Sequence, residues 1–324
     1  MQELHIGEND EGQRFDKYLK KLLAEAPGSF VYKMLRKKNI TLNGKKADGA
    51  EKRSCGDEVK LFLSDETYEK FRAKSKTVMP EAFSGSEKTL RQLKVLYEDA
   101  DILIINKPSG MLSQKARPED VSANEYILSY LLREGALTEE EMRTFRPSVC
   151  NRLDRNTSGI LIAGKTLKGL QEMSKALKER TIQKYYRCVV KGEVLREDYL
   201  KGWRVKDERE NKVTVSTVKP KSADAAPIET AYRPIWTGGG YTGLEVHLIT
   251  GRSHQIRAHL ASIGHPIIGD VKYGDAGTNE QFRRQCKVKS QMLHAYRIVF
   301  ADGREVIAPC GAEFARVEEW CKNR

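Results

Sequence analysis

In the first sixty residues, apolar positions recur first with the spacing of a helix and then with the alternation of a strand. Helical spacing of apolar residues is seen twice, first at Phe15, Leu19, Leu22 and Leu23, and then at Phe30, Met34 and Leu35. Residues 40–42 alternate as a strand does, Asn43-Gly44 is a tight-turn signal, and residues 58–63 alternate again. The pattern predicts a compact unit over residues 1–63, with two helices followed by a hairpin.

The rest of the chain divides into a polar stretch and a larger unit. Residues 64–89 are rich in Ser, Lys and Glu without sustained periodicity, which predicts a linker. Beyond residue 90, residues 102–105 read as a buried strand, Ser122 and Glu125 form a capping box for a helix through Leu132, and residues 167–177 carry a helical apolar stripe. Further strands are expected at residues 184–190, 212–218, 230–236 and 244–249, with hairpin turns at 238–240 and 302–303. We therefore expect one α+β domain over residues 90–324, with a largely antiparallel mixed β-sheet flanked by helices.

Charge and cysteine usage narrow the class of protein. The 324 residues carry a formal net charge of +12, and 39% of them are hydrophobic, which is enough for a real core. A polyphosphate partner is the expected reason for the charge, although solvated surface lysines would give the same number. Six scattered cysteines without a Cys-x-x-Cys pair argue against a disulfide framework or a zinc ribbon. The N-terminus lacks an apolar run and no stretch approaches membrane-spanning length, so we expect a cytoplasmic protein.

The most informative string runs from Asn151 to Ala163. It places Asp154 between Arg152 and Arg155 on a turn that leads into an apolar strand. The neighbouring positive charges favour the ionised carboxylate that a nucleophile or anionic catalyst requires. A lone Arg-x-Asp-Arg would more often be a structural ion pair that fixes a turn.

The wider string favours a catalytic role for Asp154 over a structural ion pair, because it resembles the His-Arg-Leu-Asp-Arg-x-Thr-Ser-Gly signature of RluA-type pseudouridine synthases. Every position from Arg152 to Gly159 fits in register, and Asn151 stands where that family has histidine. The resemblance implies the pseudouridine synthase fold and makes Asp154 the catalytic carboxylate. It also implies that Arg152 and Arg155 contact RNA.

Two further strings support this resemblance. Residues 250–260 contain Gly-Arg-Ser-His-Gln-Ile-Arg, in which Ser253 is expected to cap a helix that presents Arg257. The two histidines of this string are five residues apart, which is wrong for a helical metal pair. The family motif implies that Arg257 pairs with the catalytic aspartate and that Arg252 contacts phosphate or supports the loop. Lys184-Tyr185-Tyr186 matches the family's Lys-x-Tyr, which implies that Tyr186 stacks on the base, although either tyrosine taken alone would be a core residue.

Weaker matches complete the comparison. Asn106-Lys107-Pro108 resembles a structural family motif, and His294 lies in a final motif where a satisfied core histidine is favoured over a proton shuttle. The N-terminal unit resembles the S-four-type RNA-binding domain, on a set of residues at fitting spacing: Arg14, Asp16, Leu19, Arg36, Asn43, Gly44, Gly56 and Asp57. The residues expected to contact RNA there are Arg14, Lys33, Arg36, Lys37 and Lys38. An ordinary solvated helix end is the alternative for the last four.

The resemblance implies an RNA pseudouridine synthase, with large-subunit ribosomal RNA as the expected substrate. We expect the enzyme to need no cofactor or metal, since no Walker, Rossmann or zinc motif is present, and to act as a monomer. The target uridine must leave its stack to be reached. Asp154 could attack the ribose or promote loss of a sugar proton, and the sequence favours neither route. The alternatives are a transfer-RNA enzyme, a non-catalytic RNA-binding or ribosome-assembly factor, and a glycosidase, for which no motif supplies the second carboxylate.

Overall fold

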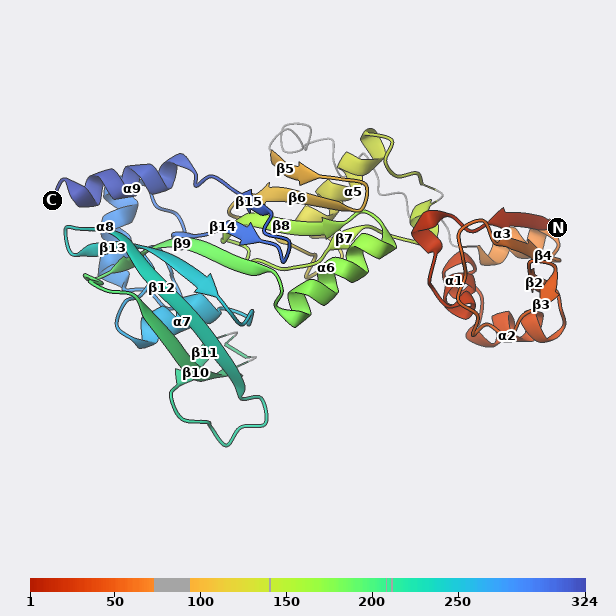
Figure 1. Cartoon of the computed structure of the whole chain (residues 1–324), viewed down its shortest axis with the longest axis horizontal. Helices are drawn as coiled ribbons and strands as arrows, with labels where there is room; N and C mark the ends of the chain where they lie inside the picture. The colour runs from red at the N-terminus through yellow and green to blue at the C-terminus, as the bar shows by residue number, and fades with distance from the viewer. Residues whose placement is uncertain (73–93, 140, 208, 211) are drawn as a thin grey trace.

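The computed structural model describes residues 1–72, 94–139, 141–207, 209–210 and 212–324. The described N-terminal residues form a small sheet in the order β1 (Gln2–His5), β4 (Glu58–Leu61), β2 (Ile40–Leu42) and β3 (Lys45–Lys46). The short helix η1 (Glu8–Asp10) follows β1, and α1 (Phe15–Leu22) and α2 (Gly28–Arg36) precede the hairpin. This unit lies at one end of the molecule (Figure 1).

The two helices of this unit form where the apolar spacing predicts them. Phe15, Leu19 and Leu35 are fully buried and share one core with the strand residues Ile40 and Leu61. The hairpin turn is also confirmed, because Asn43 and Gly44 both have positive φ angles, of 50° and 69°. Strand β1 is an addition that the sequence pattern did not predict.

The predicted linker begins later than residue 64. Residues Asp65–Phe71 form helix α3, and the Ser64 side chain accepts a hydrogen bond from the Thr67 backbone N–H at its start. Tyr68 is buried in the N-terminal core, and the Phe71 ring lies 4.7 Å from that of Phe30. The Ser64 cap and the packing of Tyr68 and Phe71 on the N-terminal core therefore account for a helix in residues that were expected to be linker. The rest of the predicted linker, residues 73–89, lies outside the described residues.

The larger unit is built on one sheet, in which the described residues form eleven strands. Its main order is β11 (Lys212–Ser216), β10 (Asp198–Asp207), β12 (Ala226–Gly238), β13 (Tyr241–Leu248), β9 (Gln183–Lys191), β14 (Leu293–Val299), β8 (Ser158–Gly164), β6 (Ile102–Lys107) and β5 (Lys94–Glu98). Strand β15 (Glu305–Ile307) pairs with β14, and β7 (Ser148–Val149) pairs with β8. Strands β8 and β14 run parallel, whereas the other described pairs are antiparallel. The expected α+β class with a largely antiparallel mixed sheet is confirmed.

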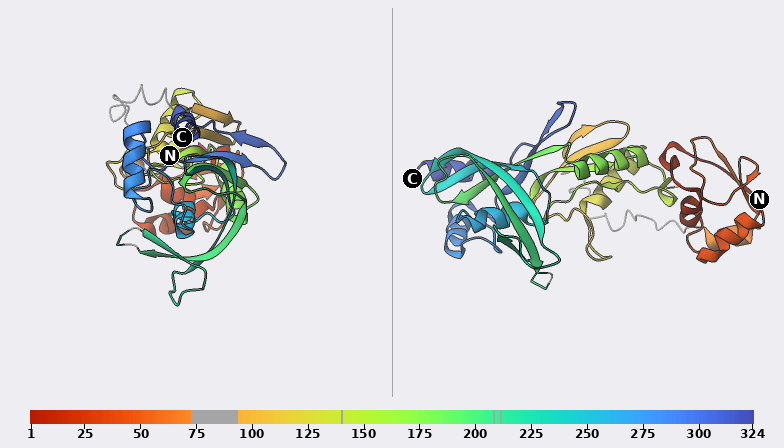
Figure 2. Two further views of the ribbon diagram at one scale, coloured as in Figure 1. Left: turned by 90° about the vertical axis from the view of Figure 1, so that its left-hand side faces the viewer. Right: turned by 60° about the horizontal axis from the view of Figure 1, so that its bottom comes forward.

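Helices cover this sheet at both of its ends. The capping box of Ser122 and Glu125 starts α5 (Ala123–Arg133), and α6 (Leu167–Glu179) packs on β8, both as predicted. The short helix η3 (Glu141–Arg143) follows α5. Helices α7 (Gln255–Ser262), α8 (Ala276–Cys286) and α9 (Ala312–Lys322) lie far from the N-terminal unit (Figure 1). The strands from β9 to β12 curve, and α7 lies on their concave side (Figure 2).

Strand β10 and the helices α8 and α9 were not predicted from the sequence. On β10 the charged residues Lys201, Arg204 and Lys206 fall on both faces, so no apolar alternation marks it. It forms instead through its register with β12, which pairs Asp198 with Tyr232 and Arg204 with Ala226.

The N-terminal unit contacts the larger unit through η1. The Thr144 hydroxyl donates a 2.7 Å hydrogen bond to Asp10 Oδ2, and Asn9 Nδ2 lies 3.4 Å from Glu141 Oε1. Burial raises the pKa of Asp10, and the Thr144 hydrogen bond opposes this effect. The segment that follows α5 therefore meets the N-terminal unit directly.

Within the described part of the chain, no helix is long and apolar enough to cross a membrane.

Candidate active site

Asp154 sits on a tight turn between β7 and β8. The Thr157 backbone N–H donates to the Asp154 carbonyl at 3.0 Å and closes the turn. Gly159 follows with a φ of 110°, and a Cβ at that position would lie 2.2 Å from the Ala295 carbonyl oxygen of β14. Only glycine fits this close approach, so the turn can sit directly against β14.

The segment from Lys107 to Ser113 fastens the Asp154 turn from the other side. Lys107 is fully buried, and its Nζ donates to the carbonyls of Pro108, Met111 and Arg155 at 3.0, 2.8 and 3.1 Å. Burial lowers the pKa of Lys107 to about 7, while the nearby Asp154 charge acts in the opposite direction. Three carbonyl acceptors use all three protons of the ammonium form. The structural role expected for this motif therefore consists of holding the backbone beside Asp154.

Asn151 has a defined structural role in place of the usual histidine. Its Nδ2 donates to the Ile160 carbonyl at 3.3 Å, and its Oδ1 accepts from the Ile162 N–H at 2.8 Å. Both partners belong to β8, so the amide joins the start of the turn to the strand that the turn enters. A side chain with one donor and one acceptor is required for this pair of bonds.

Arg257 lies between two carboxylates. Its Nη1 donates to Asp154 Oδ2 at 2.8 Å, while Nε and Nη2 donate to Asp270 Oδ2 and Oδ1 at 2.7 and 2.9 Å. Asp270 is fully buried, Arg257 is 6% exposed, and the Asp154 side chain is 28% exposed. The bidentate pair on Asp270 fixes the plane of the guanidinium, and the third bond fixes the position of the partly exposed Asp154 carboxylate.

The protonation of this pair follows from opposing effects. Burial would raise the pKa of Asp270, but the hydrogen bonds and charge of Arg257 outweigh it and hold the pKa below its usual value. Burial would likewise lower the pKa of Arg257, and its two carboxylate partners raise it instead. Both groups are therefore ionised at neutral pH.

Helix α7 presents Arg257, although it starts differently from the expectation. Ser253 was predicted to cap it, but the residue before the helix is His254, with a left-handed φ of 53° and no side-chain capping bond. The Gln255 side chain instead fixes the segment before the helix, since its Oε1 accepts from the Arg252 N–H at 3.1 Å and from the Thr250 hydroxyl at 2.8 Å. The Ser253 prediction was wrong, because the chain enters the helix through the left-handed His254 and no side chain caps it.

Asp270 reaches Arg257 through the loop that follows α7. Gly269 has a φ of 78°, and a Cβ there would lie 2.3 Å from the Ser290 carbonyl oxygen. Asn279 fastens the loop, since its Oδ1 accepts from the Gly269 N–H and its Nδ2 donates to the Asp270 carbonyl. Asp270 was not among the site residues expected from the sequence.

His254 and Tyr273 form a further pair beside Asp154. The His254 Nε2 lies 3.9 Å from Asp154 Oδ2, and its Nδ1 is 3.0 Å from the Tyr273 hydroxyl. That hydroxyl also accepts from the Val213 N–H at 2.7 Å, which leaves its own proton for His254 Nδ1. Burial lowers the pKa of His254, and the Asp154 charge opposes the shift. From the sequence, His254 had no expected role, because its spacing to His259 is wrong for a helical metal pair.

Tyr186 points to the same side of the sheet as this site. The residue is 7% exposed, and burial followed by the charge of Asp154 raises its pKa, so the ring is neutral at physiological pH. Among the described residues its hydroxyl has no hydrogen-bond partner. Tyr185 alternates to the opposite face of β9, so of the two neighbouring tyrosines only Tyr186 lies on the Asp154 side of the sheet.

The remaining predicted side chains have simpler surroundings. Arg155 Nε donates to the Gly110 carbonyl at 3.1 Å, and Arg152 and Arg252 are exposed. Of the described cations, Arg257 rather than Arg152 or Arg155 pairs with Asp154. His294 is a satisfied core histidine, as favoured from the sequence, because Ser158 and the Ala308 carbonyl occupy its two ring nitrogens at 2.8 and 2.9 Å.

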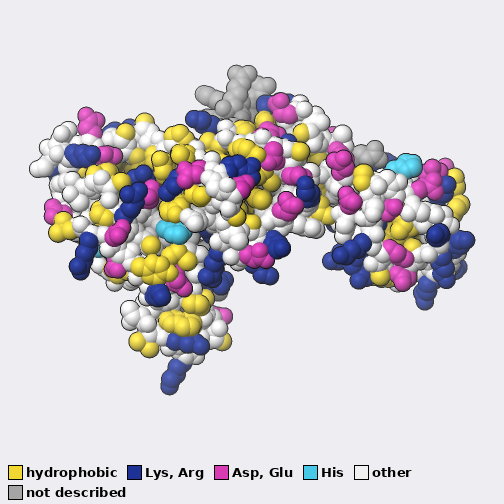
Figure 3. All heavy atoms as spheres, in the orientation of Figure 1, with side chains coloured by type: hydrophobic (Ala, Val, Ile, Leu, Met, Phe, Trp, Pro, Cys, Tyr) yellow, Lys and Arg dark blue, Asp and Glu magenta, His cyan; other side chains and the backbone are white. Residues whose placement is uncertain are grey.

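The predicted RNA-contacting cations of the N-terminal unit lie apart from the Asp154 site. Lys33, Arg36, Lys37 and Lys38 are all exposed at the end of α2, and Arg14 pairs with Asp16 at 3.1 Å. Lys and Arg side chains gather along the side of the unit that carries α2 (Figure 3). Nowhere in the described ranges do three or more metal-ligating His, Cys, Asp or Glu side chains come together.

Comparison with known proteins identifies the family of this chain. The sequence model of the RNA pseudouridylate synthase family matches residues 101–262, which include Asp154, Tyr186 and Arg257. A ribosomal large subunit pseudouridine synthase C of Vibrio vulnificus is 30% identical over 98% of this chain and 95% of its own length. The chain belongs to the RNA pseudouridylate synthase family. It is therefore an enzyme that isomerises uridine to pseudouridine in RNA.

Other similar proteins agree with the family assignment. The synthase C of Pasteurella multocida is 32% identical over 92% of this chain, and the synthase D of Yersinia pestis is 29% identical over 83%. Among solved structures, human RNA pseudouridylate synthase domain containing 4 aligns with a TM-score of 0.59 at 19% identity, over 72% of this chain and 94% of its own. Human domain containing 1 aligns with a TM-score of 0.54 at 21% identity, over 68% and 84%. These two structures support the pseudouridine synthase fold.

Proposed function

We propose that this pseudouridine synthase modifies uridines of large-subunit ribosomal RNA. The observation that carries the proposal is the extent of the match, since the Vibrio vulnificus relative named for that substrate is covered over 95% of its length. Its similarity therefore spans the N-terminal unit as well as the catalytic unit. A protein of this kind would act in the cytoplasm, and we expect it to work as a monomer because one chain supplies every residue of the site.

Asp154 would be the catalytic carboxylate. Its Oδ2 is held by Arg257, whereas its Oδ1 has no hydrogen-bond partner among the described residues. Oδ1 is the atom that would either attack the ribose carbon or remove a sugar proton when the glycosidic bond breaks. Both routes need the same ionised, oriented oxygen.

Arg257 would position Asp154, and Asp270 would position Arg257. The Asp270 pair uses two of the guanidinium's donors, so only the remaining nitrogen is free to hold Asp154. His254, kept neutral by burial, would leave the negative charge of Asp154 largely uncompensated on its other side. The arrangement favours a carboxylate that is aimed but not buried in a closed ion pair.

Tyr186 would stack on the uracil after it leaves the RNA helix. A neutral phenol ring offers a π-face for stacking and a hydroxyl for a hydrogen bond to the detached base. Holding the base while it turns is necessary, because carbon 5 must replace nitrogen 1 at the ribose.

The N-terminal unit would dock the RNA by phosphate contacts. Its exposed cations Lys33, Arg36, Lys37 and Lys38 are joined near the catalytic site by the exposed Arg152, Arg155 and Arg252. Contacts of this type fix position and carry no base sequence. Selection of one uridine would then depend on RNA shape and on which base can leave its stack.

The test is pseudouridine mapping in a strain that lacks the gene. Loss of one or more pseudouridines from large-subunit ribosomal RNA, restored by the wild-type gene and not by Asp154→Asn, is the expected result. Loss confined to transfer RNA would overturn the substrate assignment in favour of the transfer-RNA alternative. An unchanged map in both RNAs would overturn it as well.

A further inference from the structure

A single row of side chains crosses the convex face of the sheet, opposite the catalytic site. In register, Arg297 of β14 pairs with Tyr185 of β9, Tyr185 with His247 of β13, His247 with Ala231 of β12, and Ala231 with Tyr199 of β10. Paired residues in neighbouring strands point to the same face. Tyr185 and the catalytic-side Tyr186 are consecutive, so this row lies on the other side of the sheet.

One half of this row is a continuous stack. The Tyr185 and His247 rings are nearly parallel, with centroids 4.7 Å apart and an angle of 19° between planes. Arg297 covers the other face of Tyr185, with its guanidinium carbon 4.1 Å from the ring centroid. The outer face of His247 is left without an aromatic or cationic partner on the next strand, because the residue there is Ala231.

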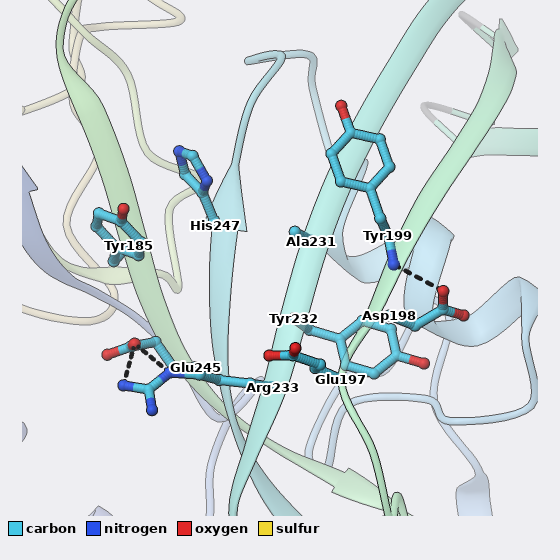
Figure 4. Close-up of a pocket in the computed structure, with 9 residues that line it drawn as sticks. All are labelled: Tyr185, Glu197, Asp198, Tyr199, Ala231, Tyr232, Arg233, Glu245 and His247. Carbon is cyan, nitrogen blue, oxygen red and sulfur yellow. Dashed lines mark hydrogen bonds and ion pairs between the residues drawn. The ribbon is translucent and has the colours of Figure 1, made fainter.

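Ala231 opens a slot between the His247 and Tyr199 rings. Strands lie about 4.8 Å apart, so side chains two strands away are separated by roughly 9.6 Å. A planar ring in van der Waals contact on both faces needs about 7–8 Å. Figure 4 shows the Ala231 methyl between the two rings, in a hollow of about 410 Å³ that these residues help to line.

Tyr199 is held as the outer wall of the slot. Tyr199 is 47% exposed to solvent, and its hydroxyl nevertheless donates a hydrogen bond to the Glu229 carboxylate. Lys201 lies over its ring, with Nζ 5.3 Å from the centroid. The row therefore ends in a cation on each side, at Arg297 and at Lys201, which suits a ligand with phosphate groups flanking a flat ring.

Carboxylates border one edge of the slot. Glu245 forms an ion pair with Arg233, whose Nη2 lies 2.7 Å from Glu245 Oε1. Glu197 and Asp198 are exposed, and the Asp198 Oδ1 accepts only the Tyr199 backbone N–H. The free carboxylate oxygens of Glu197 can accept hydrogen bonds from the exocyclic amino group of adenine, cytosine or guanine, whereas uracil offers only its ring N3–H.

We propose that the Ala231 slot binds one unpaired, amino-bearing nucleobase of the RNA, outside the catalytic pocket. The base stacks between His247 and Tyr199, and its amino group faces the exposed Glu197 at the edge of the slot. The proposal rests on RNA being the substrate, and it adds a second contact on the opposite face of the sheet, with a preference for amino-bearing bases over uracil.

The experiment measures binding of two labelled single-stranded oligonucleotides, twelve adenylates and twelve uridylates, by fluorescence anisotropy at high ionic strength. High salt suppresses phosphate contacts made elsewhere on the protein. Ala231→Leu fills the slot, and Tyr199→Ala removes its exposed outer wall. Thr237→Leu, at an exposed position of the same strand, is the matched control for added apolar volume. Thermal unfolding of each variant checks that the fold is intact.

Wild-type protein should bind oligoadenylate more tightly than oligouridylate, and both slot variants should weaken oligoadenylate binding about fivefold or more. Thr237→Leu should bind as the wild type does. Equal affinity of the variants and the wild type for oligoadenylate would overturn the proposal, as would an equal loss for both oligonucleotides. Neither result depends on which cellular RNA is modified, so pseudouridine mapping tests the substrate separately.

Discussion

Arg257 Nη1 lies 2.8 Å from Asp154 Oδ2, although 103 positions separate the two residues. The same guanidinium is anchored by two bonds to Asp270, so its third bond has little freedom to move. Asp154 is therefore aimed by a group that is itself fixed, which is what pre-organisation of a catalytic carboxylate requires.

Asp154→Asn should abolish isomerisation while RNA binding survives. The amide keeps the shape of the side chain and removes the charge that either catalytic route needs. Single-turnover assays and binding measurements on the same RNA check this. Turnover within about tenfold of the wild type, equivalent to about 1.4 kcal/mol of barrier, would show that Asp154 has a structural role instead.

Arg257→Lys should lower kcat on the order of a hundredfold with a much smaller change in KM. A lysine keeps the positive charge, but a single ammonium cannot reproduce the fork that bonds Asp270 twice and Asp154 once. The kcat and KM values of the variant separate positioning from binding. If KM rises and kcat is unchanged, Arg257 contributes to RNA affinity instead.

Asp270→Asn should destabilise the protein by about 3–5 kcal/mol, because it leaves the buried Arg257 charge without its main partner. The pKa of Asp270 is lowered in the folded state, so its contribution is complete above its usual value of 3.8 and is lost only as pH falls further. Urea unfolding at pH 5 and at pH 8 should therefore give the same difference from the wild type. A difference that shrinks already between pH 8 and pH 5 would contradict this sign.

Tyr186→Ala should lose substantially more RNA affinity than Tyr186→Phe, since stacking on a base contributes about 1–3 kcal/mol. If the hydroxyl takes part in proton transfer, Phe should bind normally and turn over on the order of a hundredfold more slowly. Affinity and turnover are measured on both variants with one RNA. Wild-type behaviour of both variants would remove Tyr186 from the site.

Replacing Lys33, Arg36, Lys37 and Lys38 together with alanine should weaken RNA binding and flatten its dependence on salt. Each lost phosphate contact reduces the slope of log K against log salt by about 0.7–0.9. The single-turnover rate at saturating RNA should change little, because these side chains lie apart from Asp154. A collapse of that rate with an unchanged salt slope would argue against docking by the N-terminal unit.

The sequence was most informative where a function depends on neighbours in the chain. Asp154 was predicted because the turn, the strand and the flanking residues form one string, and Arg257 because its helix carries a second string. The structure brings these two side chains together. Asp270 and Tyr273 were missed, since their roles arise only when the loop after α7 folds back onto Arg257 and His254. No local pattern records such a closure.

The same limit applied to the fold. Buried strands such as β6 and β8 can be predicted from their apolar runs. Strand β10 is only partly buried, and its charged residues on both faces leave no apolar alternation to detect. Arg152 and Arg155 were the obvious source of positive charge near Asp154, yet the pairing charge comes from Arg257, far along the chain. Side-chain direction, which decides such pairings, is set by packing rather than by proximity in sequence.

The close approach of Gly159 to Ala295 also has a consequence for synthesis of the enzyme. The Asp154 turn is complete only when β14 lies beside β8, and residue 295 leaves the ribosome 136 positions after residue 159. At about 5–20 residues per second this delay is roughly 7–27 s. A nascent chain should therefore expose a finished N-terminal unit well before it has an active site, so the growing protein can hold RNA before it can alter it.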